Sequence, residues 1–184
     1  GLLWLFGGSG LDAEFDHHSS LNDLWVFDPD TAYWTWMGGS PIASRHDAPI
    51  SGVYGEQGVA APENYPGPRS GATSWLDDSG VLWMFGGEGV MDELGSGNFN
   101  EVWRRDPDTG YWTWVSGARG DDRDNVNRVG VYGERLVPHP DNAPGGRVRS
   151  SMWVDDVGCI WVFGGWGFTA EGMQYFLNDL WRFD

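Results

Sequence analysis

The sequence predicts an all-β protein built from a repeated sheet, and three observations support this prediction. Landmark residues recur with a constant step of 78, namely Asn22, Asn100 and Asn178, and likewise Trp25, Trp103 and Trp181. A fixed step of this kind indicates a repeat architecture. The 184 residues include 13 Trp and 29 Gly, a composition that favours large rings packed between short strands and tight turns. Apolar residues occur in short consecutive runs bounded by turn residues, so no helix is indicated.

Each unit contains up to four predicted strands, and the units cover residues 1–69, 70–147 and 148–184. In the complete middle unit the strands are predicted at 70–75, at the run VLWMFGG (81–87), at 102–105 and at 111–115. The first unit lacks the first strand and the last unit lacks the fourth, so ten strands are predicted. The later three strands of each unit are apolar or aromatic at successive positions, which predicts burial on both faces of the sheet.

Two kinds of connection link the strands, and antiparallel pairing predicts that they lie on opposite faces. Short turns such as LDDSG (76–80) and DPDTGY (106–111) carry the Asp, Pro and Gly of tight hairpins. They lack the distal Glu of a calcium loop, which favours turn chemistry over metal binding. The long connections cover 88–99 within the middle unit, and 37–68 and 116–146 between units. Since long loops are often functional, we expect any ligand to bind on the long-loop face.

The charge balance restricts the classes of partner. With 27 acidic and 11 basic residues the formal net charge is −16, which disfavours nucleic acid and anionic membranes. No apolar run approaches the roughly 20 residues of a membrane-spanning helix, so no membrane span is predicted. The single cysteine, Cys159, cannot form an internal disulfide and is expected to be a small buried hydrophobic residue.

A diglycine after an aromatic strand, followed by Asn-Asp-Leu-Trp-x-Phe-Asp and the aromatic pair Phe27 and Trp34, resembles the kelch repeat of β-propellers. The resemblance covers essentially the whole chain. It implies four-stranded blades around a channel, with the first strand innermost and with glycines and rings filling the space between blades. These structural positions are Gly7, Gly8, Gly86, Gly87, Gly164, Gly165, Trp34 and Trp112.

The resemblance further implies that about two and a half blades are present. Ten strands cannot close a ring of about 4 to 8 four-stranded blades. The sequence begins within one predicted strand and ends just after another. We therefore expect a fragment of a longer propeller or, alternatively, a subunit that other chains complete, with the remaining blades as partners at both edges.

Two arginines are the main candidates for ligand binding. Arg69 and Arg147 precede the first strand in PGPR and PGGR, and the resemblance places them at the channel mouth on the long-loop face. There an arginine can grip a carboxylate through two hydrogen bonds, but recurrence at the same step equally fits a repeated structural hydrogen bond. Arg45, Tyr54 and Tyr132 are further candidates on this face, although the recurring GVYG around each tyrosine also fits a local folding device.

A cluster of metal-ligand residue types occurs in the first unit. His17 and His18 lie near Asp12 and Asp16. Their spacing matches no defined metal motif, and the other units lack histidine at this place. A solvated polar loop is the preferred interpretation, and no metal or cofactor is predicted.

Three functions follow as hypotheses. The leading one is a non-enzymatic binding or assembly module that presents its long connections to a protein or a glycan, in an extracellular or cell-surface setting. The second is a structural subunit of a surface or extracellular assembly. The third is an enzyme, because some kelch-like propellers, such as galactose oxidase and sialic-acid mutarotase, are catalytic. No nucleophile, phosphate-loop or metal motif supports catalysis in this sequence.

Overall fold

The chain is an all-β protein, as the sequence predicts. The computed structural model describes residues 1–14, 18–43, 50–90, 96–120 and 128–183. Within these ranges no helix is long and apolar enough to span a membrane. The strands of the described residues are, in order, β1 (Leu3–Leu11), β2 (His18–Asp28), β3 (Tyr33–Gly38), β4 (Thr73–Leu76), β5 (Leu82–Phe85), β6 (Glu88–Val90), β7 (Ser96–Asn98), β8 (Val102–Arg105), β9 (Trp112–Ser116), β10 (Arg147–Val148), β11 (Ser151–Val154), β12 (Ile160–Phe168) and β13 (Gln174–Phe183).

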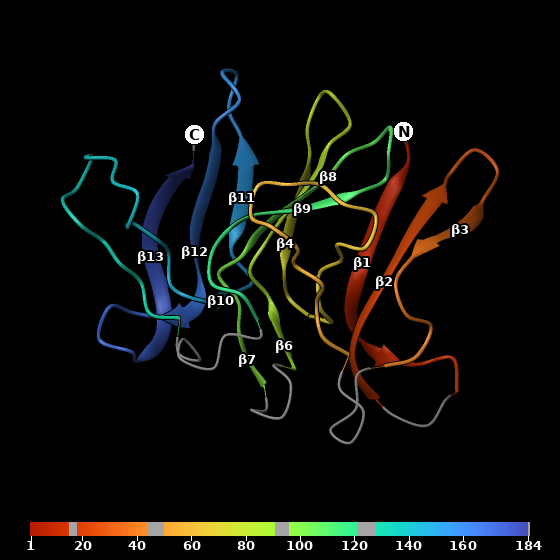
Figure 1. Ribbon diagram of the computed structural model, residues 1–184, viewed down its shortest axis with the longest axis horizontal. Coiled ribbons are helices and arrows are strands. Elements are labelled where there is room, and N and C mark those ends of the chain that lie inside the picture. Colours follow the sequence, from red (N-terminus) through yellow and green to blue (C-terminus); the bar gives the residue numbers. More distant parts are fainter. Residues whose placement is uncertain (15–17, 44–49, 91–95, 121–127, 184) are drawn as a thin grey trace.

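The strands form three main antiparallel sheets that lie side by side in chain order (Figure 1). The first sheet has the order β1-β2-β3 and the middle sheet the order β4-β5-β8-β9. In the last sheet β12 pairs with β10, β11 and β13. Each predicted strand overlaps one of these strands, and neighbours in sequence pair in space. The first strands of the two later units, β4 and β11, contact each other, so the sheets approach one another along this edge.

In each unit, pairing between the second and third predicted strands extends past the diglycine of the second strand. In the outer sheets, β1 and β12 run through the glycines, and the pairing register shifts between Phe6 and Gly8 and between Phe163 and Gly165. Such a shift marks a β-bulge. In the middle unit the strands are interrupted there, and β6 pairs with β7 as a separate two-stranded sheet. The connections expected as irregular loops are therefore partly extended hairpins.

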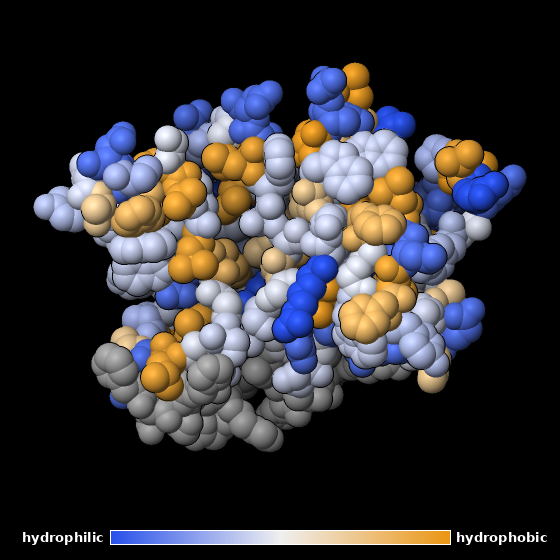
Figure 2. Space-filling view, turned by 180° about the vertical axis from the view of Figure 1, so that it is seen from behind, coloured by the Kyte–Doolittle hydropathy of each residue, from blue (hydrophilic) through white to orange (hydrophobic). Residues whose placement is uncertain are grey.

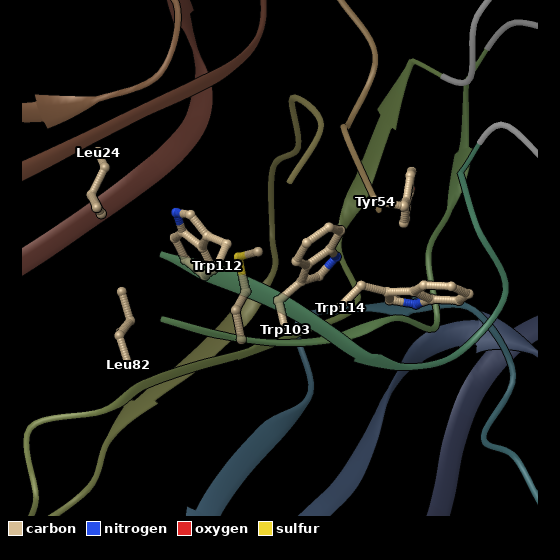
Figure 3. Close-up of a cluster of buried hydrophobic side chains, with 7 residues drawn as sticks. Leu24, Tyr54, Leu82, Trp103, Trp112 and Trp114 are labelled. Carbon is tan, nitrogen blue, oxygen red and sulfur yellow. The ribbon is translucent and has the colours of Figure 1, made fainter. Parts of the chain in front are cut away.

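Two apolar clusters hold the sheets together. One lies between the first and middle sheets and is drawn in Figure 3, where rings from the middle sheet stand near Leu24 of the first. The rings of Tyr54 and Trp103 lie 5.1 Å apart, and those of Trp103 and Trp112 meet edge to face at 6.4 Å, a geometry that aromatic pairs prefer. The second cluster, between the middle and last sheets, contains Phe85, Val102, Ile160 and Val162.

Burial on both faces is correct for the middle sheet and wrong for the outer two. Strands β5, β8 and β9 are largely buried, whereas every residue of β3 from Tyr33 to Met37 is exposed. Trp34, expected to fill the space between sheets, is 52% exposed and contacts Phe27, whereas its equivalent Trp112 is 1% exposed. Figure 2 shows orange hydrophobic side chains reaching the surface on both flanks. Among the described residues, an outer sheet has one neighbouring main sheet, and this sheet covers one of its faces.

The connections between units fold on themselves and on the next sheet. Val53 pairs with Tyr65, and Val131 with Ala143, as isolated bridges. These bridges confirm that the recurring GVYG motif is a local folding device. The connection from the first unit also crosses to the middle sheet, where Ala61 pairs with Trp112. It thereby covers the edge of the neighbouring sheet.

The short turns are stabilised by their aspartates, as their composition predicts. Asp106 Oδ1 accepts hydrogen bonds from the backbone N–H groups of Asp108 and Thr109, both within 2.9 Å. These bonds, that of Thr109 above all, lower the pKa of Asp106. In the last unit, Asp155 accepts from the backbone of Cys159 and from the indole of Trp161.

The diglycines occur where the next unit comes closest. Gly86 has a φ of +68°, and a Cβ atom there would lie 2.5 Å from the carbonyl oxygen of Arg147. No side chain fits without moving one sheet relative to the next. The structural role expected for the glycine pairs therefore has a steric cause at this position.

We expect Gly86→Ala to destabilise the protein more than Gly58→Ala. Both glycines have left-handed φ, so each alanine carries a cost of roughly 1–2 kcal/mol. Only at Gly86 does the added carbon meet backbone, because nothing lies within 4 Å of the corresponding position at Gly58. Thermal unfolding should show the larger loss of Tm for Gly86→Ala. Equal losses would contradict the close approach of the sheets.

Candidate functional site

Arg69, a predicted ligand-binding residue, is buried between two sheets. Its Nε donates to the carbonyl of Gly67 at 3.0 Å and its Nη1 to the carbonyl of Gly86 at 3.1 Å. Its Nη2 forms a 2.7 Å ion pair with Glu101 Oε2, and both side chains are 0% exposed. The whole guanidinium is therefore used within the fold. Because each of its nitrogens donates to an acceptor in the protein, burial of the charge is compensated.

Glu101 is the centre of a hydrogen-bond cluster. It accepts from Trp103 Nε1 at 2.8 Å as well as from Arg69, and the Tyr54 hydroxyl donates to its other oxygen. The Tyr54 hydroxyl in turn accepts from the backbone N–H of Gly120 at 2.5 Å. Burial, reinforced by the neighbouring Glu101 charge, raises the pKa of Tyr54. The hydroxyl therefore stays protonated and keeps donating to the carboxylate.

The same cluster recurs in the last sheet around Asp179. Arg147 donates to both carboxylate oxygens at 2.6 and 2.8 Å, and Trp181 Nε1 donates at 2.7 Å. Arg147 also repeats the bonds of Arg69 to backbone carbonyls, here those of Gly145 and Gly164. We call each set of arginine, tyrosine, acid and tryptophan an inter-sheet lock. The first lock is Arg69, Tyr54, Glu101 and Trp103, and the second is Arg147, Tyr132, Asp179 and Trp181.

The second lock is less buried, and its titratable groups are shifted in opposite directions. Burial acts to raise the pKa of Asp179, but hydrogen bonds from Arg147 and Trp181 outweigh it and bring that pKa to about 2. The Tyr132 hydroxyl donates to Asp179 at 2.8 Å. Partial burial and this hydrogen bond raise the pKa of Tyr132 to about 12. The ionised acid and the neutral phenol are thus the states that hold the lock together.

Each lock arginine also holds the preceding sheet through its backbone. The carbonyl of Arg69 accepts from the N–H of Gly8 in the first sheet at 2.9 Å. The carbonyl of Arg147 accepts in the same way from Gly87 in the middle sheet at 2.9 Å. Each lock arginine therefore joins two sheets. Its carbonyl binds the diglycine of the preceding sheet, and its guanidinium binds the acid of the following sheet.

The structure assigns most of the predicted site residues to these locks. Arg69, Arg147 and Tyr54 are buried, which contradicts a role in gripping an external ligand and agrees with a repeated structural hydrogen bond. Tyr132 is 39% exposed, but its hydroxyl is engaged with Asp179. Arg45 lies outside the described residues. The acids were missed, although the sequence holds the signal: Asp23, Glu101 and Asp179 recur with the step of 78.

The metal candidates are only partly described. Asp16 and His17 lie outside the described residues. Of His18 only the backbone is described: it begins β2 and pairs with Leu11 of β1. Asp12 is buried and accepts from the backbone N–H groups of Glu14 and Ala43. This carboxylate therefore has a structural role in its loop. Among the residues that the structure places, no group of three potential metal ligands occurs.

A cavity of about 820 Å³ opens where the three sheets meet. Ser9, Glu88 and Trp166 line it, and each directly follows the diglycine of its unit. Residues directly after the lock arginines also line it, with Ser70 following Arg69 and Val148 following Arg147. The cavity is therefore positioned by the locks and diglycines, although no lock side chain lines it. Sequence reasoning did not identify it, because its residue types differ from unit to unit.

The lining of this three-sheet cavity combines charge, hydroxyls and aromatic surface. Glu88 and Arg149 supply opposite charges, and Ser9 and Ser70 supply hydroxyls. The exposed rings of Trp166 and Phe176 meet edge to face, with centroids 4.9 Å apart. Arg149 adopts a φ of +56°, and its N–H donates to the carbonyl of Gly71 at 2.8 Å. Such a surface offers acceptors, donors and a flat apolar ring to a small polar ligand.

Replacing Arg69 by methionine is expected to destabilise the protein by about 3–5 kcal/mol, because Glu101 would remain buried without its cation. Urea unfolding would measure this loss. Arg135→Met, at an exposed arginine, is the matched control and should change the unfolding free energy little. A second substitution, Glu101→Gln, should restore part of the stability of Arg69→Met. No recovery in this double variant would contradict the pairing.

The second lock predicts a specific pH dependence. The folded pKa of Asp179, about 2, lies below the roughly 3.9 of an unfolded aspartate. Its stabilisation is therefore present above the unfolded value and is lost as the pH falls from about 4 towards about 2. Asp179→Asn should lower the unfolding free energy at about pH 6, and this difference from the parent protein should become smaller as the pH falls to about 3. Urea titrations of both proteins would show this, and a pH-independent difference would refute it.

Comparison with known proteins adds little. No family model and no curated protein matches the chain. Among solved structures, that of YjhT is similar with a TM-score of 0.43 and 20% sequence identity, over 79% of this chain. The chain spans 28% of the length of that structure. So weak a likeness assigns neither a family nor a function to this protein.

Proposed function

We propose that this chain is a non-enzymatic binding module of kelch-like propeller type that holds a sugar unit of a glycan in the three-sheet cavity. The observation that carries the proposal is the meeting of three equivalent positions, Ser9, Glu88 and Trp166, around one cavity. Positions related by the repeat are expected to converge where repeated sheets share an axis. Each sheet would then be one blade.

The chemistry of the cavity supports a sugar as ligand. A pyranose ring has an apolar face of C–H groups that can lie against an exposed indole such as Trp166, and its hydroxyls both donate and accept. Glu88 accepts hydrogen bonds, and Arg149 donates them. The volume of about 820 Å³ falls within the range of about 300–1,000 Å³ of small-molecule sites. A glycan ligand is also consistent with an extracellular or cell-surface setting.

A protein partner on the long-loop face is supported less well. A stable protein interface needs roughly 800 Å² of surface from each partner. The polar and aromatic groups described above instead line a concave site, the three-sheet cavity. The arginines expected to grip a ligand carboxylate on this face, Arg69 and Arg147, are buried in the locks.

A structural subunit is the second candidate function, and one observation favours it. The outer faces of the first and last sheets expose large apolar side chains, including Leu3, Trp34, Phe163 and Leu180. Extended apolar patches of this kind mark interaction surfaces in soluble proteins. A chain with such faces is suited to extend an assembly of sheets on either side.

The sugar proposal predicts that tryptophan fluorescence and calorimetry detect binding of hexoses, hexuronates or short oligosaccharides. Trp166→Ala and Glu88→Gln should each weaken binding at least tenfold, which corresponds to about 1.4 kcal/mol. Trp34→Ala removes an indole that is more exposed than that of Trp166 and lies on the outer face of the first sheet, and it should leave binding unchanged. Recovery of unaltered sugar, checked by NMR, would separate binding from catalysis. The proposal fails if no sugar binds or if Trp166→Ala binds as well as the parent protein.

A further inference from the structure

The first sheet contains half of a third lock. Asp23 stands at the repeat position of Glu101 and Asp179, and Trp25 Nε1 donates to Asp23 Oδ2 at 2.6 Å. In the two complete locks, the tyrosine and arginine come from the connection that precedes the sheet. Both connections of this kind, around 39–72 and 117–150, are already used by Glu101 and Asp179. Within the part of the chain that the structure describes, the acid and indole of the third lock are thus in place without a lock tyrosine and arginine.

The surface around Asp23 repeats a surface that is covered in the middle sheet. Leu3 is 59% exposed and its equivalent Leu82 is 5% exposed; the corresponding values for Trp36 and Trp114 are 49% and 9%. Trp34 and Trp112 differ in the same way. In the middle sheet this face is covered by the first sheet and by the connection that carries Tyr54 (Figure 3). The first sheet therefore presents the same face uncovered.

The edge of the first sheet offers the same hydrogen-bonding groups as the middle sheet. There, the connection places the N–H of Gly58 on the carbonyl of Trp114 at 2.9 Å, and Asn64 Nδ2 on the carbonyl of Trp112 at 3.1 Å. Both carbonyls belong to β9, the last strand of its sheet. The equivalent strand β3, with Trp34 and Trp36 at these positions, is likewise the last strand of the first sheet.

We propose that this face of the first sheet is a socket for another repeat unit of the same kind. The socket consists of Asp23 and Trp25, surrounded by Leu3, Leu5, Trp34 and Trp36. Its occupant is the connecting segment and first strand of that unit, with a tyrosine and an arginine placed on Asp23 as Tyr54 and Arg69 are placed on Glu101. The carboxylate favours a cation and the exposed rings favour an apolar segment. The edge of β3, the last strand of its sheet among the described residues, favours an extended backbone.

This inference does not rest on the sugar proposal, because none of the socket residues lines the three-sheet cavity. The test supplies the missing segment within one chain. A copy of residues 40–79 is joined ahead of Gly1, which then takes the place that Gly80 has after the original segment. All native residues are retained, and near-ultraviolet circular dichroism checks that the parent fold persists.

The extended chain should unfold at a Tm about 5 °C or more above the parent, with its tryptophans less accessible to acrylamide. Asp23→Asn, which keeps an acceptor for Trp25, should remove at least half of this gain in the extended chain and leave the Tm of the parent unchanged. Replacing the copied arginine by methionine should have the same effect. The two changes combined should remove no more of the gain in Tm than either change alone.

Several results would overturn the proposal. One is an extension that gives no gain in Tm or disrupts the parent fold. Another is an Asp23→Asn effect of equal size in parent and extended chains, which would show that Asp23 serves only the first sheet itself. A third is sedimentation in which the parent chain forms oligomers that Asp23→Asn dissociates. That result would assign the socket to a second copy of this chain instead of a further repeat unit.

Discussion

The structure depends on one buried pairing between an arginine and a carboxylate of the next sheet. The guanidinium of Arg69 makes three bonds in one plane, to Gly67, Gly86 and Glu101. A lysine ammonium could not supply this fixed set of directions. Isolated in the interior, either charge would be strongly destabilising. The fold therefore keeps the arginine, the acid and the carbonyls between them in register.

Other features of the chain follow from this pairing. Because the backbone of the arginine also binds the preceding diglycine, the sheets come too close for a side chain at Gly86. The long connection must cross from one sheet to the next in order to bring Tyr54 and Arg69 to Glu101. The cavity lies next to these fixed residues in the chain, so its lining can vary while its place is maintained. Residues that recur in each unit hold the sheets, and their immediate neighbours, such as Glu88 and Trp166, line the cavity.

The strands could be predicted from the sequence, because their aromatic runs and turn residues act locally. Asp106 fixes its turn by accepting hydrogen bonds from the backbone of Asp108 and Thr109, and the sequence run that contains these residues predicts the turn directly. Burial could not be predicted in this way. Trp34 and Trp112 occupy the same place in the repeat, yet one is exposed and the other buried, because burial depends on whether a neighbouring sheet is present.

The site was harder to predict for a chemical reason. An arginine before a strand can hold a ligand carboxylate or an internal one, and its residue type is the same in both cases. Only Glu101, at 32 residues from Arg69, decides between them. The recurrence of an acid at Asp23, Glu101 and Asp179 could have indicated the internal partner. The cavity left no such signal, since Ser9, Glu88 and Trp166 share a position and no chemistry.

Each lock is divided between consecutive units, and this division gives the array a direction. A unit supplies its acid and indole to the connection behind it, and its tyrosine and arginine to the sheet ahead. Neither half is self-complementary, so two such arrays cannot form a lock between like ends. Exchange of a single unit by recombination would have to preserve both halves at once, which ties the inheritance of neighbouring units together.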